Sequence, residues 1–375
     1  MPSMFVRKTP LTAGLALSGL LLVGLLLAGC ATLPEARAVD CSGIAMPDVA
    51  VSADGRTAST TLDVLTYNIE GLGWPARRGR ASELAEIGAR LSALRAAGQG
   101  PDVVLFQEVF SKAAVGAVDA AGYPAQTAGP GRRSRRDLPA AGSTGRRNWI
   151  RGELGLRFTT GGLAISSRYP IVEAEGEPFS RRGCAGLDCL SNKGALFARI
   201  AVPGAPAPVD VFNTHMNSRK ASRAPRGRTA AAHAIQAVEL SAFMAVRRNP
   251  DHAAVLGGDF NMRGSDARFE IFDFLLPLTL VHRYCVEAPE QCAVKASWDG
   301  DEPWMDTQDL QLFEDGRRMT IRPIRVETMF DGRPDSPALS DHDALRVVYE
   351  LSWPAELTAP AGSSCRAGTG LPGRR

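Results

Sequence analysis

Polar side chains follow several short apolar runs of this 375-residue sequence, at the position where each run ends. They are of the types that bind metal ions, transfer protons and contact phosphate groups. A buried strand has no structural reason to end in such residues. Endings of this kind predict one polar site along one rim of a sheet. The residues concerned are Asn68, Glu108, His215, Asn217, Asp259, Asn261, Asp341 and His342.

Two of these endings carry the more specific signals. Two glycines precede Asp259, and glycines let other backbone approach a site closely. Asp259 and Asn261 would project to the same side of an extended chain. At the last ending Asp341 directly precedes His342, which supplies a base and an acidic group able to orient it. We therefore interpret these two endings as parts of a catalytic site.

The elements that must position these residues are short strands alternating with helices. Apolar runs rich in β-branched and aromatic residues predict strands, and apolar residues at three- and four-residue steps predict helices. The pattern indicates an α/β fold. The predicted strands are 62–67, 103–106, 163–166, 195–202, 209–212, 253–256 and 344–351, and the clearest predicted helices are 81–97 and 229–246.

The N-terminus resembles a bacterial export signal. An apolar run over residues 11–27 leads through small residues into Cys30. This pattern predicts a lipoprotein signal peptide over 1–29 and lipidation of Cys30, followed by a tether over 30–58. An uncleaved membrane anchor is the alternative. Ala31 is typical of lipoproteins sent to the outer membrane, so we expect an exported protein held at a membrane surface.

Six cysteines remain beside Cys30, an even number that is consistent with an oxidising compartment. A zinc site is the alternative, but the spacings lack a Cys-x-x-Cys pair. We predict three disulfides, namely Cys184 with Cys189, Cys285 with Cys292, and Cys41 with Cys365.

Charge is unevenly distributed along the chain. The 43 Lys and Arg residues nearly balance the 40 Asp and Glu residues, so net charge indicates no class of partner. Eight arginines nevertheless fall within residues 132–157, and five basic residues fall within 219–228. Both segments are interpreted as surface loops that meet phosphate groups, with ordinary solvated loops as the equally weighted alternative.

The ordered motifs YNIE, QEVF, NTHMNS, GGDFNM and LSDHDAL resemble those of the endonuclease/exonuclease/phosphatase superfamily. The resemblance spans residues 62–351. It implies a four-layer α/β sandwich, in which two packed mixed β-sheets are flanked by helices. On this basis the catalytic domain is expected over 59–353, with a C-terminal tail over 354–375.

The resemblance also implies a metal and phosphate site. Glu108 matches the metal-binding carboxylate, and Asn68 matches its neighbour at the metal or the phosphate. Oxygen ligands of this kind suit Mg²⁺, which is the expected cofactor, although another divalent cation is possible. His215 and Asn217 match residues that contact the scissile phosphate, and an imidazolium at His215 is expected to neutralise charge there.

A second set of roles concerns the attacking water. Asp259 and Asn261 match the pair that positions this water, and His342 matches the general base, held by Asp341. Relatives often carry an Asp-Tyr pair before the final motif, where this chain has the run TQDLQ. Asp309 is the first candidate for that position and Asp306 the second.

A further stretch is similar to the bacterial and neutral sphingomyelinase branch. Asp188 precedes Lys193 by five positions, a pair that implies a lysine contact switching the site into its active form. A surface lysine in a disulfide-closed loop is the alternative. The leading expectation is hydrolysis of a phospholipid, with sphingomyelin giving ceramide and phosphocholine. The chain would meet its substrate at a membrane surface, held there by lipidated Cys30.

Two other functions are weighed against this one. The arginine-rich segments favour a nuclease of the same superfamily, but Trp149 is the one aromatic residue inside the longer segment. Nucleic-acid binders usually interleave more aromatic residues with their basic ones. An inactive binding protein on the same scaffold is the other alternative, although every motif side chain is present. The oligomeric state is left open.

Overall fold

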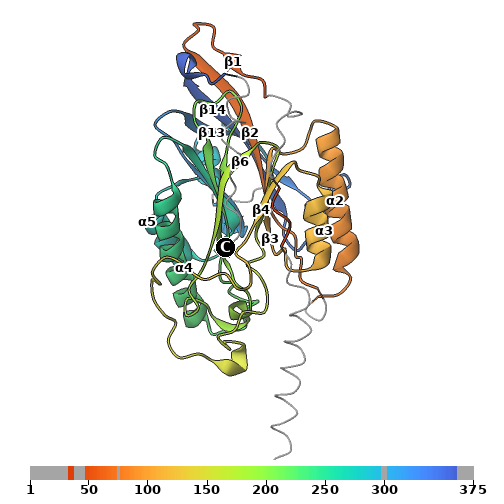
Figure 1. The fold of residues 1–375 in the computed structure, drawn as a ribbon, viewed down its shortest axis with the longest axis vertical. Coiled ribbons are helices and arrows are strands. Elements are labelled where there is room, and N and C mark those ends of the chain that lie inside the picture. The colour runs from red at the N-terminus through yellow and green to blue at the C-terminus, as the bar shows by residue number, and fades with distance from the viewer. Residues whose placement is uncertain (1–32, 38–46, 74–76, 297–301, 361–375) are drawn as a thin grey trace, which may run out of the picture.

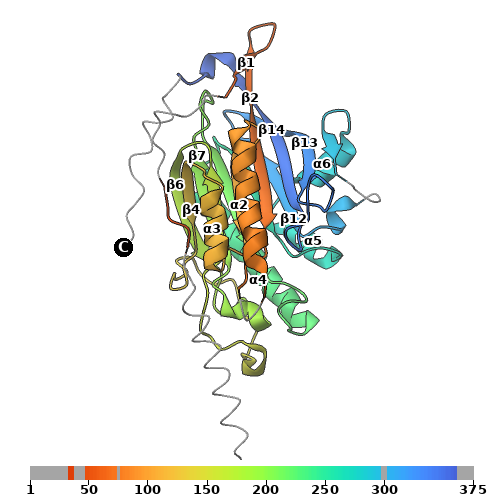
Figure 2. The same ribbon diagram turned by 90° about the vertical axis from the view of Figure 1, so that its right-hand side faces the viewer.

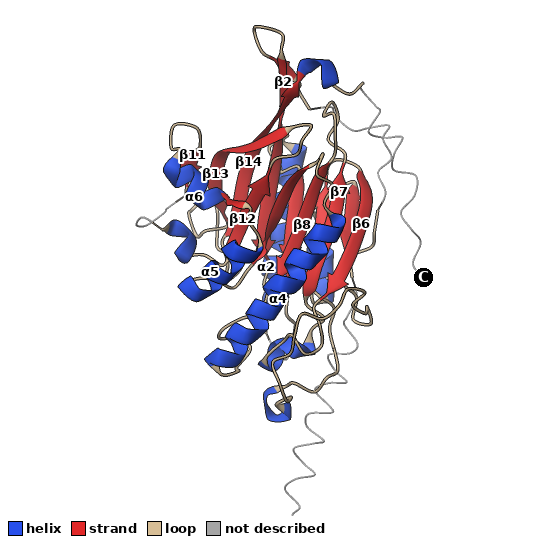
Figure 3. Cartoon of the chain, turned by 90° about the vertical axis from the view of Figure 1, so that its left-hand side faces the viewer, coloured by secondary structure: helices blue, strands red, loops and turns tan. Residues whose placement is uncertain are grey.

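The computed structural model describes residues 33–37, 47–73, 77–296 and 302–360. Two β-sheets pack face to face, and helices cover their outer faces (Figures 1 and 3). This is the expected α/β architecture of two mixed sheets flanked by helices. The predicted signal peptide, Cys30, Cys41 and Cys365 lie outside the described residues.

The first sheet has the strand order β11-β13-β14-β2-β3-β5-β4, with β1 added on β2. Its pairing is mixed, since β2 and β3 run parallel while β14 and β2 run antiparallel. The strands are β1 (Ala50–Val51), β2 (Thr57–Asn68), β3 (Val103–Gln107), β4 (Ala125–Ala128), β5 (Ala164–Ser167), β11 (Ala293–Lys295), β13 (Thr320–Met329) and β14 (Ala344–Pro354).

The second sheet has the order β10-β12-β9-β8-β7-β6, in which β8 and β9 are parallel. The strands are β6 (Ile171–Pro178), β7 (Gly194–Ile200), β8 (Val209–His215), β9 (Ala253–Asp259), β10 (Thr279–Leu280) and β12 (Asp309–Glu314).

Helices α2 (Arg80–Ala96) and α3 (Lys112–Ala120) cover the first sheet, as Figure 2 shows. Helices α4 (Arg226–Arg247) and α5 (Asp266–Leu275) cover the second. Among the described residues, the remaining helical elements are α6 (Val281–Glu287) and the short 3-10 turns η2 (Trp149–Arg151), η3 (Gly186–Leu190), η4 (Pro303–Met305) and η5 (Ala355–Leu357).

Strand β2 illustrates why the central strands are apolar on both faces. Leu62 and Val64 pack between the two sheets, whereas Leu65 and Tyr67 pack against the helices of the first sheet. A strand covered on both sides cannot alternate apolar and polar residues. Its buried run therefore continues until Asn68, where the polar site begins.

Buried amide side chains join the two sheets next to this site. Gln107 on β3 donates to Asn213 Oδ1 on β8 over 2.7 Å. On β12, Gln311 donates to the carbonyl oxygens of Val64 and Leu345 in the first sheet, at 3.0 and 3.1 Å. Buried amides are costly unless paired, so these bonds fix how the sheets lie against each other.

The ends of the catalytic segment differ from the expected boundaries. Ala50 and Val51 pair with β2, which begins at Thr57, so the final part of the predicted tether belongs to the sheet. At the other end β14 extends to Pro354, the first residue of the predicted tail.

Candidate active site

Strand register brings three of the predicted residues into one row. His215 at the end of β8 pairs with Asp259 at the end of β9. Asp259 pairs in turn with Asp309, the first residue of β12. In the first sheet Asn68 pairs with Gln107, and Glu108 follows directly. The polar ends therefore lie along one rim of both sheets, as the sequence predicted.

The two glycines before Asp259 are required by close packing. Gly258 has a φ of 148°, and a Cβ there would overlap the carbonyl oxygen of Thr214 on the neighbouring strand. A Cβ at Gly257 would lie 2.6 Å from both Leu105 and Thr66 across the sheet interface. Glycine tolerates both constraints, which lets β9 deliver Asp259 deep between the sheets.

Asn68 orients the carboxylates around it. Its Nδ2 donates to Asp259 Oδ2 at 3.0 Å and to Glu108 Oε1 at 3.3 Å. Its Oδ1 accepts the backbone N–H of Glu70 at 3.1 Å, which fixes the direction of the amide. In this geometry Asn68 holds Glu108 in place, and its predicted role as a direct ligand stays a prediction.

His215 is buried between a cation and a carboxylate. Its Nε2 lies 2.9 Å from Lys193 Nζ and 3.3 Å from Asp259 Oδ2. Burial, with the charge of Lys193 and His342 nearby, lowers the pKa of His215 well below its ordinary value. This shift favours the neutral ring, and the expected imidazolium at this position stays a prediction. Lys193 places a positive charge beside the ring.

Lys193 reaches the site from β7 and is 6% exposed. Besides His215, its ammonium donates to Asp188 Oδ2 and to the Met216 carbonyl oxygen, both at 3.1 Å. Asp188 also accepts the Ser218 backbone N–H at 2.6 Å, directly after β8. Asp188 and Lys193 thus form a buried ion pair that touches a predicted catalytic residue, and the interpretation of Lys193 as a surface lysine is wrong.

His342 is held by Asp309 and not by its sequence neighbour. The His342 Nδ1 hydrogen-bonds Asp309 Oδ2. Asp341 is 53% exposed, lies 3.9 Å from His342 Nε2, and forms a salt bridge with Arg77. The predicted role of Asp341 is therefore corrected. The cause is geometric, because Asp309 at the start of β12 reaches Nδ1, whereas Asp341 lies on the side of Nε2 and is exposed.

The site contains several buried carboxylates close together. Burial raises the pKa of Glu108, and burial with the carboxylates of Asp309 and Glu108 raises the pKa of Asp259 to about 7. Asp309 Oδ1 is buried without a hydrogen-bond partner in the described part of the chain. Clustered carboxylates that are costly to ionise together fit a bound cation, and their oxygens suit Mg²⁺. Glu108 is the residue best placed by its sequence motif to hold it.

The two remaining asparagines make mainly backbone contacts. Asn217 accepts the Ala185 N–H at 2.9 Å and donates to the Ser218 carbonyl at 2.9 Å. Asn261 donates to the Met216 carbonyl at 3.1 Å, while its own N–H donates to Asp259 Oδ1 at 3.0 Å. Both fix the loops beside His215 and Asp259, and their predicted contacts with phosphate and water stay predictions.

A family model described as Endonuclease/Exonuclease/phosphatase family matches residues 65–326. This span is more than half of the chain and includes Asn68, Glu108, His215 and Asp259. The chain belongs to the endonuclease/exonuclease/phosphatase family. The resemblance inferred from the motifs is thereby confirmed.

Similarity to individual proteins points to one branch of this family. The chain is 35% identical over 123 residues to Sphingomyelinase C of Listeria ivanovii, a match that covers 31% of this chain and 33% of the relative. Sphingomyelinase C from Streptomyces griseocarneus has a similar structure, with a TM-score of 0.53 and 26% identity over 77% of this chain and 99% of that one. Beta toxin of Staphylococcus aureus with bound magnesium ions has a TM-score of 0.52 at 21% identity, covering 77% and 99%.

Two predicted disulfides of this family member are confirmed. Cys184 bonds Cys189, and Cys285 bonds Cys292. The first disulfide joins Cys189 of η3 to Cys184 just before this element, so it helps to position Asp188 on η3 and its ion pair with Lys193. The third predicted pair lies outside the described residues.

Gln308 is a site residue that the sequence interpretation missed. Its Nε2 lies 3.2 Å from His342 Nε2. It stands beside Asp309 in the TQDLQ run, which was the available signal. Asp306, the second candidate, lies just before that run and is the C-cap residue of η4.

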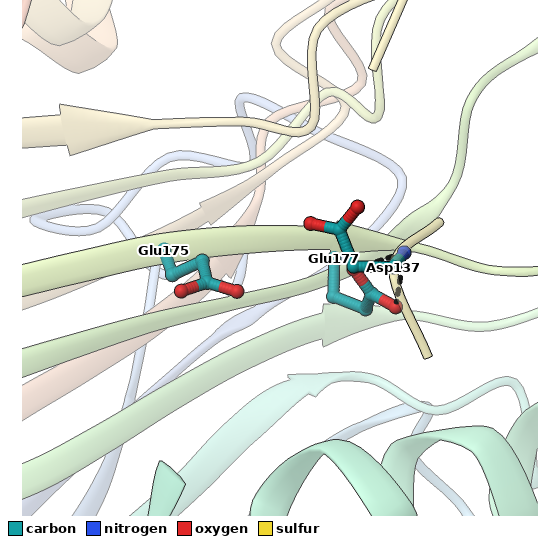
Figure 4. A group of neighbouring side chains, drawn as sticks. All are labelled: Asp137, Glu175 and Glu177. Carbon is teal, nitrogen blue, oxygen red and sulfur yellow. Dashed lines mark hydrogen bonds between the residues drawn. The ribbon is translucent and has the colours of Figure 1, made fainter. Parts of the chain in front are cut away.

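A separate group of acids lies at the edge strand β6, where Figure 4 shows Glu175 and Glu177 of this strand with Asp137 from another segment. Glu177 accepts backbone N–H groups of Asp137 and Leu138 and pairs with Arg136 at 3.4 Å. Glu175 pairs with Arg247. Because arginines already pair with Glu175 and Glu177, we assign no metal to this group.

Proposed function

We propose that this family member is a magnesium-dependent phosphodiesterase that hydrolyses sphingomyelin to ceramide and phosphocholine. The observation that carries the proposal is the convergence of Glu108, Asp259 and His342 with the buried Asp188–Lys193 pair. The first three are the groups that a phosphodiester hydrolase needs. The ion pair distinguishes the sphingomyelinase-like motif from the general family pattern.

Glu108 would hold the metal ion, with Asn68 fixing its carboxylate. A bound Mg²⁺ would stabilise the charge that builds on the phosphoryl oxygens. The ammonium of Lys193 adds a second positive charge beside His215, 2.9 Å from its Nε2. Fixed charges of this kind act strongly in a site that excludes water.

His342 is the proposed general base. Asp309 holds Nδ1, and Nε2 would take the proton of the attacking water in place of its 3.2 Å contact with Gln308 Nε2. Asp259 Oδ2 lies 4.0 Å from this Nε2, so the two groups could act on the same water. As the water oxygen bonds to phosphorus, the bond from phosphorus to the ceramide oxygen breaks. The ceramide oxygen takes up one proton and leaves as the alcohol, which balances the proton that His342 removes from the water.

We further propose that the enzyme is exported and held at the outer membrane through lipidated Cys30. The sequence pattern before Cys30 is the support for this. Labelled fatty acid should be incorporated into the native chain and not into Cys30→Ser. Equal labelling of both would exclude the anchor.

The function is tested by incubating purified protein with sphingomyelin, phosphatidylcholine or plasmid DNA, in Mg²⁺ or in chelator. We expect phosphocholine release from sphingomyelin in Mg²⁺, its loss in chelator, and its loss in His342→Ala. Nicked plasmid with intact lipid would favour the nuclease, a function that the exposed arginines also support. No turnover of any phosphodiester would favour the inactive scaffold.

A further inference from the structure

We propose that a surface outside the catalytic groups docks onto an anionic phospholipid bilayer. It consists of η2, η3 and the loops around them, and we call it the docking tip. The inference builds on the lipid substrate proposed above, because it concerns how the enzyme meets a bilayer. Figure 1 draws η2 in yellow at the lower end of the molecule, beyond the strands.

The docking tip exposes large apolar side chains. Trp149 is 73% exposed and Ile150 99%, and both belong to η2. Leu156 is 60% exposed, and Leu187 on η3 is 37% exposed. A group of such residues on one surface marks an interaction site. Tryptophan is also enriched at the level of lipid head groups, where its ring is apolar and its N–H meets water.

Contacts join these side chains into one surface. A Cβ at Gly152, directly after η2, would lie 2.9 Å from Leu187 Cδ2, so η2 and η3 touch. Arg151 donates to the Arg223 carbonyl at 2.6 Å, which ties η2 to the second arginine-rich segment. The apolar residues and both arginine-rich segments thus share one region.

Arginines surround the apolar residues, and their charge is largely uncompensated. Nearby acids are already engaged, because Glu153 is buried against Arg228 and Asp188 pairs with Lys193. A small pocket beside the Cys184–Cys189 disulfide is lined by several guanidinium groups. Exposed arginines of these loops that form no salt bridge with any described residue include Arg146, Arg147, Arg151, Arg181, Arg182, Arg223 and Arg226.

This combination fits an anionic bilayer better than a nucleic acid. Guanidinium groups bind phosphates in either case. A nucleic-acid surface, however, uses aromatic rings that stack on bases. Ile150, Leu156 and Leu187 have no such use, whereas aliphatic residues next to arginines are typical of surfaces that lie at a lipid interface.

The docking tip also lies at the catalytic end of the molecule. Leu187 is the neighbour of Asp188, which pairs with Lys193, and Lys193 contacts His215. A bilayer bound at the tip would therefore lie near the active site. This is the orientation that a lipid phosphodiesterase requires.

The test measures tryptophan fluorescence of the full chain on vesicles that contain brominated lipid, which quenches only rings at the bilayer. Vesicles are made of phosphatidylcholine with or without phosphatidylglycerol, without sphingomyelin and in chelator. We expect stronger quenching of the native chain than of Trp149→Phe on anionic vesicles, and a smaller difference on neutral ones. Arg181→Gln with Arg182→Gln should weaken docking roughly 10- to 30-fold, since each arginine near such a surface contributes about 1 kcal/mol.

Matched controls lie elsewhere on the molecule. Phe274→Ala removes an 86% exposed ring from α5, and Arg56→Gln with Arg318→Gln removes two exposed charges. Both should leave the quenching unchanged. Equal quenching of the native chain and Trp149→Phe on anionic vesicles would overturn the docking tip. The docking tip would also be overturned if the Arg181→Gln, Arg182→Gln variant lost plasmid binding while its quenching on anionic vesicles stayed unchanged.

The two proposals can fail separately. If the chain docks through Trp149 but releases no phosphocholine, the sphingomyelinase proposal is refuted and the docking proposal stands. If the chain hydrolyses sphingomyelin but shows no quenching difference between the native chain and Trp149→Phe, the docking proposal is refuted and the proposed function stands.

Discussion

The imidazole of His342 is bonded through Nδ1 to Asp309, a residue 33 positions earlier in the chain, while Asp341 beside it points to Arg77. Asp309 is 2% exposed, so its charge acts on the ring with little screening. A buried carboxylate in this position fixes which ring nitrogen carries the proton and stabilises the imidazolium that forms during catalysis.

Asp309→Asn is therefore expected to lower kcat roughly 100- to 10,000-fold, the range of a general-base contribution, with KM little changed. Asp341→Asn is the matched control and should change kcat less than about threefold, because an exposed ion pair contributes little. Initial rates on sphingomyelin over a range of concentrations separate the two constants. A larger loss in Asp341→Asn would return the orienting role to that residue.

Protonation of His342 should depend on the metal. Burial opposes its charge, but the carboxylates of Asp309, Asp259 and Asp341 outweigh burial and raise its pKa to about 11. A base must be neutral to accept a proton. A cation held at Glu108 would counter the carboxylates and lower this pKa, so Mg²⁺ binding near pH 8 is expected to release protons. Calorimetry in buffers of different ionisation enthalpy measures this release, and His342→Gln should reduce it.

The same raised pKa predicts how stability varies with pH. Because the folded pKa of His342 lies above the ordinary 6.5, its contribution to the free energy of unfolding is fully present below about pH 6.5. That contribution is lost as pH rises toward 11. Denaturant unfolding without metal should show this decline, and His342→Gln should flatten it. Proton uptake on Mg²⁺ binding, or a stability that rises over this window, would contradict the assigned charge.

The sequence predicted the central strands and the rim of polar residues because these signals are local. Strands β2, β3, β8 and β9 are apolar runs that end in polar residues, and the observed ends lie close to the predicted ones. Helices 81–97 and 229–246 are confirmed as α2 and α4, because their apolar spacing was regular.

Contacts between residues on different strands could not be predicted in the same way. Asp309 meets Asp259 only because β12 pairs with β9 in one particular register, and nothing local specifies that register. Strands β6 and β13 were missed because charged residues interrupt them. Glu175 and Glu177 on β6 are held by arginines from distant segments, so the strand looks polar in sequence.

The Asp188–Lys193 pair should show strong coupling. Its side chains are 11% and 7% exposed, so Lys193→Met would leave a poorly solvated carboxylate and is expected to cost roughly 3 kcal/mol in the free energy of unfolding. The double variant with Asp188→Asn should cost clearly less than the two single costs added together. Denaturant unfolding of all four proteins gives this coupling. Additive costs would mean that the contact contributes nothing.

The disulfide around η3 should matter for activity as well as for stability. Replacing Cys184 and Cys189 by serine removes a short cross-link worth about 2 kcal/mol, and frees the loop that positions Asp188. Replacing Cys285 and Cys292 removes a cross-link of similar size near α6 and is the matched control. We expect similar losses of stability from both, with kcat reduced only in the first. Equal kcat in the two variants, measured where both are folded, would exclude the positioning role.

Gly258 should be the most sensitive backbone position at the site. Alanine there would place a Cβ against the Thr214 carbonyl at a φ of 148°, which L-residues rarely adopt. The strand must shift to relieve this overlap, and Asp259 would shift with it. Gly258→Ala is expected to lower the free energy of unfolding by more than about 2 kcal/mol and to lower kcat.

Gly116 on α3 is the control, since a Cβ there meets nothing within 4 Å. Gly116→Ala should instead stabilise the protein by about 0.5–1 kcal/mol, because alanine favours the helix. Thermal unfolding and initial rates of the two variants decide the matter, and a Gly258→Ala enzyme with native stability would mean that β9 is not packed against β8 as closely as described.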